Sequence, residues 1–448
     1  MNVEGKRMID WSEWAKLSTN PDISIDKIDK PEALEGLVVL DLSYGSFSGL
    51  FASSLLAEFG ARVIRVEPPK GDIAREMTPD GMKINGTGLP YIVESRNKQN
   101  ITLNIGNVEG KNILRSIVSK VDVLIETFSP GYMDDMGIGW SDLKKVNNRL
   151  IYLALNSYGQ KGELAERAKK SKWRDYDVIA QALSGFVTTT GIPDEYTEFP
   201  EHTRVPTKMG NWMGWYAGGL YGAFSVMGAL IFREFSGGEG QFIDMSPAEA
   251  LMMMNNYAVQ FYGLTGEVMG RPANIEPAAH PYCYVRCKDG MVFVAGYTDP
   301  NWKTLCTIIE RPDLVEKYKT TKDRVNTENM FNIIAEIEKF TRIKTRDELV
   351  SIFNLYKGGP GVAVVGEVVT PFETMKFDHW YERDILKKVE SEKYGDLIIQ
   401  WLPAKMTETP PRIKWIGGEI GEDNAFVYLD ILGIDRKELD KLRENEII

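Results

Sequence analysis

Two aspartates stand directly before a helix-like segment, in a place where a carboxylate can do chemistry. Asp175 and Asp177 precede the apolar run of "KWRDYDVIAQALSG". A carboxylate at a helix start stabilises the free backbone N–H groups and the positive end of the helix dipole. At its usual pKa of about 4 it is a weak nucleophile, but proximity and exclusion of water let it attack an acyl group. The position favours capping of the following helix, and a role as a nucleophile is the alternative for Asp177.

Histidine and cysteine are too sparse to suggest a metal centre. The chain has three of each, at His202, His280, His379, Cys283, Cys287 and Cys306. No Cys or His pair completes the spacing of a structural zinc site. A small, odd number of cysteines is typical of a reducing compartment. We therefore expect a cytoplasmic protein that holds no metal.

One turn between a strand and a helix has some features of dinucleotide binding. After the strand-like "LVVLDL" the chain reads "LSYGSFSG", and Glu67 ends the next strand, where an acid can contact a ribose. The tight G-x-G-x-x-G pattern is missing, and a pyrophosphate needs it to approach the backbone closely. The sequence therefore predicts an ordinary strand–helix turn and neither NAD nor FAD.

A long uncharged run, 212–232, raises the question of a membrane span. It is long enough to cross a bilayer, but five glycines dilute its hydrophobicity. The chain is 43% hydrophobic and 26% charged, which is typical of a soluble globular protein. Its net charge of −11 argues against nucleic acid as a general partner. We expect a buried, glycine-faced helix, with neither a membrane nor nucleic acid as partner.

Strand-like and helix-like segments alternate through the first half of the chain. The strand-like segments are 37–42, 61–67, 100–105, 122–128 and 149–157. A helix is expected over 48–60, with Ser48 as its N-cap and Gly60 as its stop. Such alternation predicts a parallel sheet with helices on both faces.

The pattern changes after Gln241. The Met-rich "PAEALMMMNNYAVQFYGL" predicts one helix whose methionines fill a core. Asp289-Gly290 joins two strand-like runs and indicates a hairpin. Near the C-terminus, Asp435 is expected to cap a short amphipathic helix.

The segment "LEGLVVLDLSYGSFSGLFASSLLAEFGARVIRVEPPKGD" resembles the opening of the family III CoA-transferases of the formyl-CoA and carnitine type. "DVLIETFSPGYMDDMGIGW", "FREFSGGEGQFIDMS" and "PYCYVRCKDGMVFVAGY" have that family's form too. The resemblance covers nearly all of the chain after Leu34. It implies an α/β fold, with a Rossmann-like large domain and an inserted small α+β domain, in an interlocked, ring-like dimer. We place the large domain at 1–246 and 336–448, and the small domain at 247–335.

The family's reaction requires one aspartate at the start of a glycine-containing helix. Its carboxylate attacks an acyl-CoA thioester and forms a mixed anhydride. The resemblance places Trp215 at that position, and no acid follows in the helix before Glu234. Asp177 matches a pocket-lining acid or asparagine of the family. A racemase of this family would carry a histidine where Tyr176 stands.

The resemblance also implies a weak or degenerate CoA site. CoA phosphates require arginine or lysine. Three positions at which the family offers cations hold Pro68, Gly106 and Asp135, and Arg174 alone keeps its charge. The other implied CoA contacts are Ser46, Phe47, Leu103, Thr127 and Phe128. A further set of cations forms either a second basic patch or a solvated surface: Arg65, Lys70, Arg75, Arg96 and Lys98.

The resemblance therefore implies a CoA-transferase subunit that is itself catalytically silent. It would pair with a homologous subunit that keeps the aspartate. The substrates would be an acyl-CoA, with succinyl-CoA expected, and a carboxylic acid such as benzylsuccinate in aromatic degradation. The CoA thioester is a substrate, and no separate cofactor is expected. Two alternatives stay open: an active homodimer that uses Asp177, and a non-enzymatic acyl-CoA-binding protein.

Overall fold

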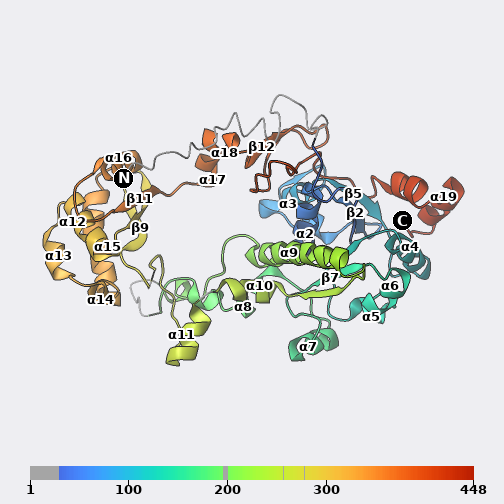
Figure 1. The fold of residues 1–448 in the computed structure, drawn as a ribbon, viewed down its shortest axis with the longest axis horizontal. Coiled ribbons are helices and arrows are strands. Elements are labelled where there is room, and N and C mark those ends of the chain that lie inside the picture. Colours follow the sequence, from blue (N-terminus) through green and yellow to red (C-terminus); the bar gives the residue numbers. More distant parts are fainter. Residues whose placement is uncertain (1–29, 195–199, 256, 277) are drawn as a thin grey trace. The chain divides into compact units, whose positions relative to one another are not determined.

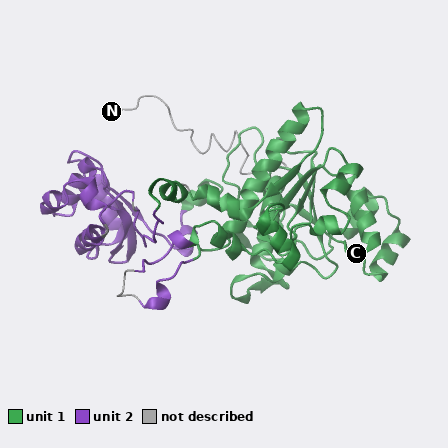
Figure 2. Cartoon of the chain, turned by 90° about the horizontal axis from the view of Figure 1, so that it is seen from below, with its two compact units in different colours: residues 1–187, 208–266, 378–448 green, residues 188–207, 267–377 purple. Residues whose placement is uncertain are grey.

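The computed structural model describes residues 30–448 apart from 195–199, 256 and 277. The chain forms two compact units, which Figure 2 colours separately. The large unit comprises the residues up to 187 together with 208–266 and 378–448. The small unit comprises 188–207 and 267–377.

A six-stranded parallel sheet forms the centre of the large unit (Figure 1), in the order β5-β2-β1-β6-β7-β8. The strands are β1 (Val38–Asp41), β2 (Arg62–Glu67), β5 (Lys98–Thr102), β6 (Val123–Glu126), β7 (Ile151–Leu155) and β8 (Phe242–Met245). Counted along the chain, this is the 3-2-1-4-5-6 order of Rossmann folds. The α/β prediction is confirmed.

Helices cover both faces of this sheet because its strands are apolar on both sides. On one face, α2 (Phe47–Glu58) and α9 (Met213–Phe235) pack on a core that includes Val39, Leu153 and Val226. On the other face, α4 (Val108–Val118), α6 (Trp140–Val146) and α19 (Arg436–Glu444) pack on a core that includes Leu40 and Leu124. Asp435 caps α19, since its carboxylate accepts the N–H of Glu438 at 2.9 Å.

The remaining elements of the large unit lie around this sheet. They include β3 (Lys83–Ile84), β4 (Thr87–Gly88), α3 (Leu89–Glu94), α5 (Tyr132–Asp135), α7 (Glu163–Ser171), α8 (Asp177–Leu183), α10 (Pro247–Met254), α11 (Ala258–Thr265), α18 (Asp378–Glu382), β12 (Leu386–Val389) and β13 (Leu397–Gln400).

The uncharged run forms α9, which is long and apolar enough to cross a membrane by length and composition. Half of its most apolar window is nevertheless buried in the protein. The buried side is lined with glycine: a Cβ atom at Gly219 would lie 2.5 Å from the carbonyl oxygen of Ser48 in α2. At Gly218 it would lie 2.6 Å from the ring of Pro247. This side of α9 therefore packs at backbone distance, as the glycine spacing predicted.

The predicted N-cap of α2 was wrong by two residues. Ser46, not Ser48, is the cap, because Ser46 has an extended backbone and its side chain accepts the N–H of Ser48. Ser48 already belongs to the first turn. The predicted helix stop at Gly60 is confirmed. Gly60 follows the C-cap residue Phe59 and adopts a positive φ of +103°.

The Met-rich segment differs from its prediction in two ways. It forms two helices, α10 and α11, because α10 ends at the cap residue Asn255. Its methionines at 252, 253 and 254 are 45%, 74% and 41% exposed, so they do not fill a core. Ala250 and Leu251 of α10 take the buried positions instead.

The small unit is an α+β fold with its own core. Its antiparallel sheet has the order β11-β10-β9, and the hairpin of β9 (Tyr282–Cys287) and β10 (Gly290–Ala295) turns at Asp289-Gly290, as predicted. The other elements are β11 (Val364–Glu367), α12 (Asp299–Ile308), α13 (Asp313–Lys317), α14 (Thr321–Arg324), α15 (Thr327–Thr341), α16 (Arg346–Leu355) and α17 (Pro371–Thr374).

The division into units differs from the predicted boundaries of 247–335 for the small domain. The small unit continues to 377, because Ile337, Leu349 and Phe353 pack into the core formed by β9 and β10. At its other boundary, α10 and α11 belong to the large unit.

Candidate active site

The carboxyl-terminal edge of the parallel sheet carries the candidate site. The strand order reverses between β1 and β6, and open α/β sheets bind ligands at this switch point. The two loops that follow these strands meet there. The N–H of Tyr44 donates to the Thr127 hydroxyl at 2.9 Å, and the Tyr44 ring stacks on Phe128 with centroids 6.5 Å apart.

Four of the implied CoA contacts come together at this edge. Ser46 and Phe47 begin α2 after β1, and Thr127 and Phe128 follow β6. The Ser46 hydroxyl is already used inside the fold, because it caps α2 and forms a 2.8 Å hydrogen bond with the Ser48 hydroxyl.

The other two implied contacts lie apart from that group. Leu103 follows β5, two strands away from β1, and is 2% exposed. Arg174 is exposed in the loop before α8, where its carbonyl accepts the Tyr158 hydroxyl at 3.1 Å. These six contacts stay predictions.

Trp215 occupies the first turn of α9 and is 3% exposed. Its ring lies against Phe47 and Trp212, with centroid distances of 6.0 and 5.8 Å, and Phe47 stacks on Trp212 at 4.4 Å. These three rings, which we call the aromatic cluster, fill the space at the start of α9. Sequence reasoning missed Trp212, whose spacing of three residues from Trp215 on a helix was the available signal.

Asp177 is tied into the fold through both carboxylate oxygens. One accepts the backbone N–H of Trp215 at 3.0 Å, and the other accepts the side-chain amide of Gln181 at 2.7 Å. Its partner is therefore the start of α9, whereas α8 has no side-chain cap. The expectation that Asp177 caps the helix that follows it was wrong in this respect. Burial raises the pKa of Asp177 above its usual value.

Asp175 is the unexpected acid of this region. Both of its carboxylate oxygens are buried and have no hydrogen-bond partner among the described residues, and the same holds for the Ser157 hydroxyl and the Trp215 indole N–H. Burial raises the pKa of Asp175 to about 6, although Ser157 and Trp215 lie close enough to offset part of that rise. Sequence reasoning treated Asp175 as a helix-end residue, and no local pattern distinguishes a buried loop aspartate from a solvated one.

The cations proposed for a second basic patch are mostly internal. Four are buried in ion pairs: Arg65 with Asp41 and Asp72, Arg75 with Glu67, Arg96 with Glu58 and Glu94, and Lys98 with Asp41. Burial also lowers the pKa of Lys98 to about 7. Within this set only Lys70 is exposed. The other four cations form neither a basic patch nor a solvated surface, because buried carboxylates already neutralise them.

Asp135, which the resemblance places where the family offers a cation, has a neighbour of opposite charge. Lys169 of α7 lies 2.9 Å from its carboxylate, and both side chains are exposed. This pair offsets the repulsion that Asp135 alone would exert on a phosphate. Across the described residues, no group of three or more His, Cys, Asp or Glu side chains is arranged to hold a metal ion.

The fold defines a Rossmann-like α/β protein, with its candidate ligand site at the carboxyl ends of β1 and β6. Comparison with known proteins makes the class specific. The model of CoA-transferase family III matches residues 34–424. The chain belongs to this family, as its resemblance predicted.

Its relatives include enzymes named for succinyl-CoA. Succinyl-CoA–D-citramalate CoA-transferase of Chloroflexus aurantiacus is 30% identical over 93% of this chain and 98% of that protein. The alpha and beta subunits of succinyl-CoA–L-malate CoA-transferase of the same organism are each 30% identical over 93% of this chain, covering 92% and 98% of those subunits. A crystal structure of a CAIB/BAIF family protein from Brucella suis matches with a TM-score of 0.76 and 26% identity, over 90% of this chain and 100% of that one.

Proposed function

We propose that this chain is a subunit of a CoA-transferase that moves CoA from succinyl-CoA to a carboxylic acid such as benzylsuccinate. A homologous chain that carries the nucleophilic aspartate would complete the enzyme. The single observation that carries the proposal is that Trp215, which the resemblance places at the position of the family's nucleophile, is a buried aromatic residue. The names of the relatives support succinyl-CoA as the donor.

The reaction requires a carboxylate that attacks the thioester carbonyl, releases the CoA thiolate and becomes a mixed anhydride. An indole cannot do this, because its nitrogen lone pair is part of the aromatic ring. The aromatic cluster of Phe47, Trp212 and Trp215 also occupies the start of α9 sterically. Both arguments favour chemistry at the partner's site rather than at this one.

The first alternative, a homodimer that uses Asp177, finds little support in its contacts. Each of its oxygens already accepts a hydrogen bond, one from the backbone of α9 and one from Gln181. Attack on a thioester would break at least one of them and free a buried N–H group, which costs about 1–3 kcal/mol.

An exposed apolar face on α9 supports a partner chain. Leu220, Phe224, Ile231 and Phe235 are 49%, 68%, 60% and 87% exposed, and their spacing places them on one side of the helix. We call this set the α9 stripe. Large exposed apolar patches mark surfaces that another molecule covers. The family's interlocked dimer, in which two chains enclose one another, would supply such a cover.

Co-expression with a homologous chain that retains the aspartate tests the proposal. This chain alone should transfer no CoA from succinyl-CoA to benzylsuccinate, citramalate or malate, and the mixed complex should. Replacing the partner's aspartate by asparagine should abolish transfer in the complex. Turnover by this chain alone, lost on Asp177→Asn, would overturn the proposal in favour of the homodimer. CoA binding without transfer in either preparation would favour the acyl-CoA-binding protein.

A further inference from the structure

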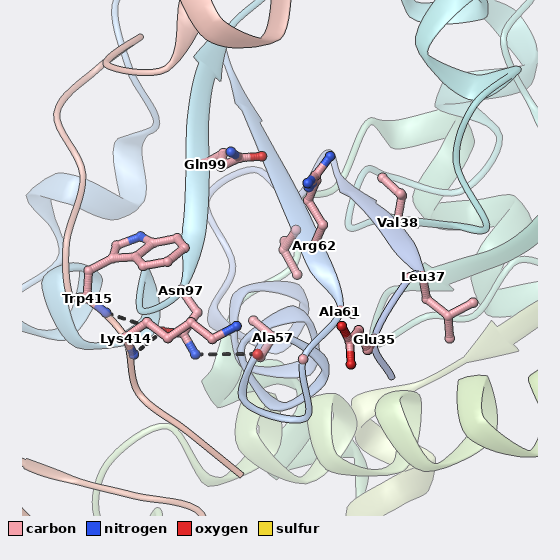
Figure 3. Close-up of a pocket in the computed structure, with 13 residues that line it drawn as sticks. Glu35, Leu37, Val38, Ala57, Ala61, Arg62, Asn97, Gln99, Lys414 and Trp415 are labelled. Atoms are coloured by element: carbon pink, nitrogen blue, oxygen red, sulfur yellow. Dashed lines mark hydrogen bonds between the residues drawn. The ribbon is translucent and has the colours of Figure 1, made fainter. Parts of the chain in front are cut away.

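A cavity of about 400 Å³ opens at the amino-terminal edge of the parallel sheet (Figure 3). Its walls come from the starts of β1 and β2, the turn before β5 and the segment at Lys414 and Trp415, all in the large unit. The candidate active site lies at the other edge, at the far ends of these strands. Strands β1 and β2 have four and six residues, so the two edges are separated by roughly 13–20 Å. The cavity is therefore not part of the thioester site.

Arg62 is the free cation of this cavity. It is exposed, and within the described part of the chain its guanidinium has no hydrogen bond or ion pair, unlike the buried Arg65 three residues later. An unpaired guanidinium is suited to a planar oxyanion, which it can bind through two parallel hydrogen bonds.

Trp415 gives the cavity a fixed aromatic face. The residue is 44% exposed, while its indole N–H donates to the carbonyl of Lys98 at 3.1 Å. Asn97 holds the backbone of this wall, since its side-chain oxygen accepts the N–H groups of Lys414 at 2.6 Å and Trp415 at 3.3 Å. A ring held in this way offers a stacking surface that needs little ordering when a ligand binds.

The other polar groups of the cavity determine where an anion can bind. Gln99 lines it, and the side-chain oxygen of Gln99 is buried without a partner in the described chain. Lys414 is already neutralised by Glu32 at 2.6 Å. Glu35 is exposed and, in Figure 3, lies at the opposite end from the Arg62 guanidinium and the Gln99 amide. A ligand with one negative charge would therefore find a free positive charge only at the Arg62 end of the cavity.

We propose that this cavity binds a small aromatic anion, with its ring on Trp415 and its carboxylate or phosphate on Arg62. Its volume lies within the range of about 300–1,000 Å³ that is usual for small-molecule sites. The proposal rests on Arg62 and Trp415 lining the same cavity, because a free arginine or an exposed tryptophan alone is common on a protein surface. The proposal does not depend on the function proposed above, since it uses no residue of the thioester edge.

Four probes separate the two parts of this recognition in calorimetry on the chain in its native assembly. AMP and benzoate each combine a ring with an oxyanion, adenosine supplies a ring alone, and inorganic phosphate supplies an anion alone. At least one of AMP and benzoate should bind, with one site per chain, and about tenfold more tightly than adenosine and phosphate. Which of the two binds identifies the class of ligand, a nucleotide or an aromatic carboxylate.

Variants locate the binding. Arg62→Ser and Trp415→Leu should each weaken it by about tenfold or more, whereas Trp415→Phe should keep it within about threefold because the ring remains. Arg286→Ser, at an exposed arginine of the small unit, is the matched control and should change nothing. Circular dichroism and thermal unfolding check that each variant is folded. The proposal is wrong if no probe binds below about 5 mM. It is also wrong if AMP or benzoate binds but folded Arg62→Ser and Trp415→Leu bind as the parent does.

Discussion

The buried carboxyl group of Asp175 links the candidate site to pH. Its pKa is about 6 in the folded protein and 3.8 when unperturbed, because burial penalises the charged form. The folded state therefore holds more protons than the unfolded state between about pH 4 and 6, and its stability falls as the pH rises through that window. At neutral pH the charged, unpaired carboxylate should cost about 2–3 kcal/mol of unfolding free energy.

Asp175→Asn should remove this cost. We expect the variant to be more stable than the parent at pH 8, by up to about 2 kcal/mol, and to gain much less at pH 4, where the folded state holds the proton and the pH lies close to the unperturbed pKa of 3.8. Urea unfolding of both proteins at the two pH values measures the difference. An equal gain at both pH values would show that the charge of Asp175 is not its cause.

Asp177 differs from Asp175 because both of its carboxylate oxygens accept hydrogen bonds. Asp177→Asn keeps one acceptor for the Trp215 N–H but turns an amide group toward Gln181, so it should cost about 1 kcal/mol of stability. In the mixed complex with the partner chain, CoA transfer should stay within about threefold of the parent, because Asp177 would act on the fold and not on substrate. Denaturant unfolding and the transfer assay are measured on the same preparation, and a loss of more than a hundredfold in rate without a loss of stability would give Asp177 a chemical role.

At the scale of the element, α9 shows how glycine sets a packing distance. A methyl group at Gly219 would lie 2.5 Å from the Ser48 carbonyl oxygen, which belongs to the backbone and cannot move aside. Gly219→Ala should therefore destabilise the protein by about 2 kcal/mol or more. Gly228, on the same helix, has open space around it, so Gly228→Ala should be neutral or stabilising by up to about 1 kcal/mol. Thermal unfolding of the two variants compares them directly, and equal effects would contradict the packing argument.

Elements whose signal is local were predictable from the sequence. Five of the six strands of the parallel sheet, the stop at Gly60, the hairpin at Asp289-Gly290 and the cap at Asp435 each depend on a few neighbouring residues, whereas β8 was not predicted as a strand. Ser46 and Ser48 show the limit of that reasoning. Both are good caps, and the choice between them depends on the backbone where β1 ends.

Side chains whose role depends on distant residues were not predictable in the same way. Arg65 reads as a surface cation, but in the fold it meets Asp41 from β1 and Asp72 from the following loop. Met252 and its neighbours read as core, but α10 turns them outward. The candidate site was placed through a resemblance, and the fold brings Ser46, Phe47, Thr127 and Phe128 to one edge, whereas the buried Asp175 became visible only in three dimensions.

At the scale of the whole molecule, the path of the chain explains why the predicted domain boundary differs. The chain leaves the large unit and returns to it at Asp378, beyond α15 and α16. Those helices have the amphipathic pattern that any helix on a sheet has, so their pattern does not reveal which sheet they cover. Their contacts with β9 and β11 place them in the small unit.

The affinity for CoA is also a property of the whole molecule, because it depends on all the charges along the carboxyl-terminal edge of the parallel sheet. With Arg65, Arg75, Arg96 and Lys98 buried in ion pairs, few cations remain for phosphates. CoA should bind this chain alone only weakly, at roughly 0.1–1 mM, which corresponds to about 4–5.5 kcal/mol. Calorimetry with CoA measures this, and a low-micromolar constant would favour a binding protein or an active homodimer.

The α9 stripe provides the test of assembly. If a homologous chain covers it, Phe224→Ser and Phe235→Ser together should shift the mixed complex toward free chains, because the complex then loses two buried aromatic contacts worth about 1.5–3 kcal/mol each. Val108→Ser is the control, since Val108 is 73% exposed on α4, away from the stripe. Native mass spectrometry of the co-expressed chains measures the fraction in complex. The parent and the control should remain assembled and the double variant should not, because interlocked chains depend on their interface for stability. A stable homodimer of this chain alone, unaffected by the double substitution, would contradict two parts of the proposed function. No partner chain would then be needed, and the α9 stripe would not be an interface.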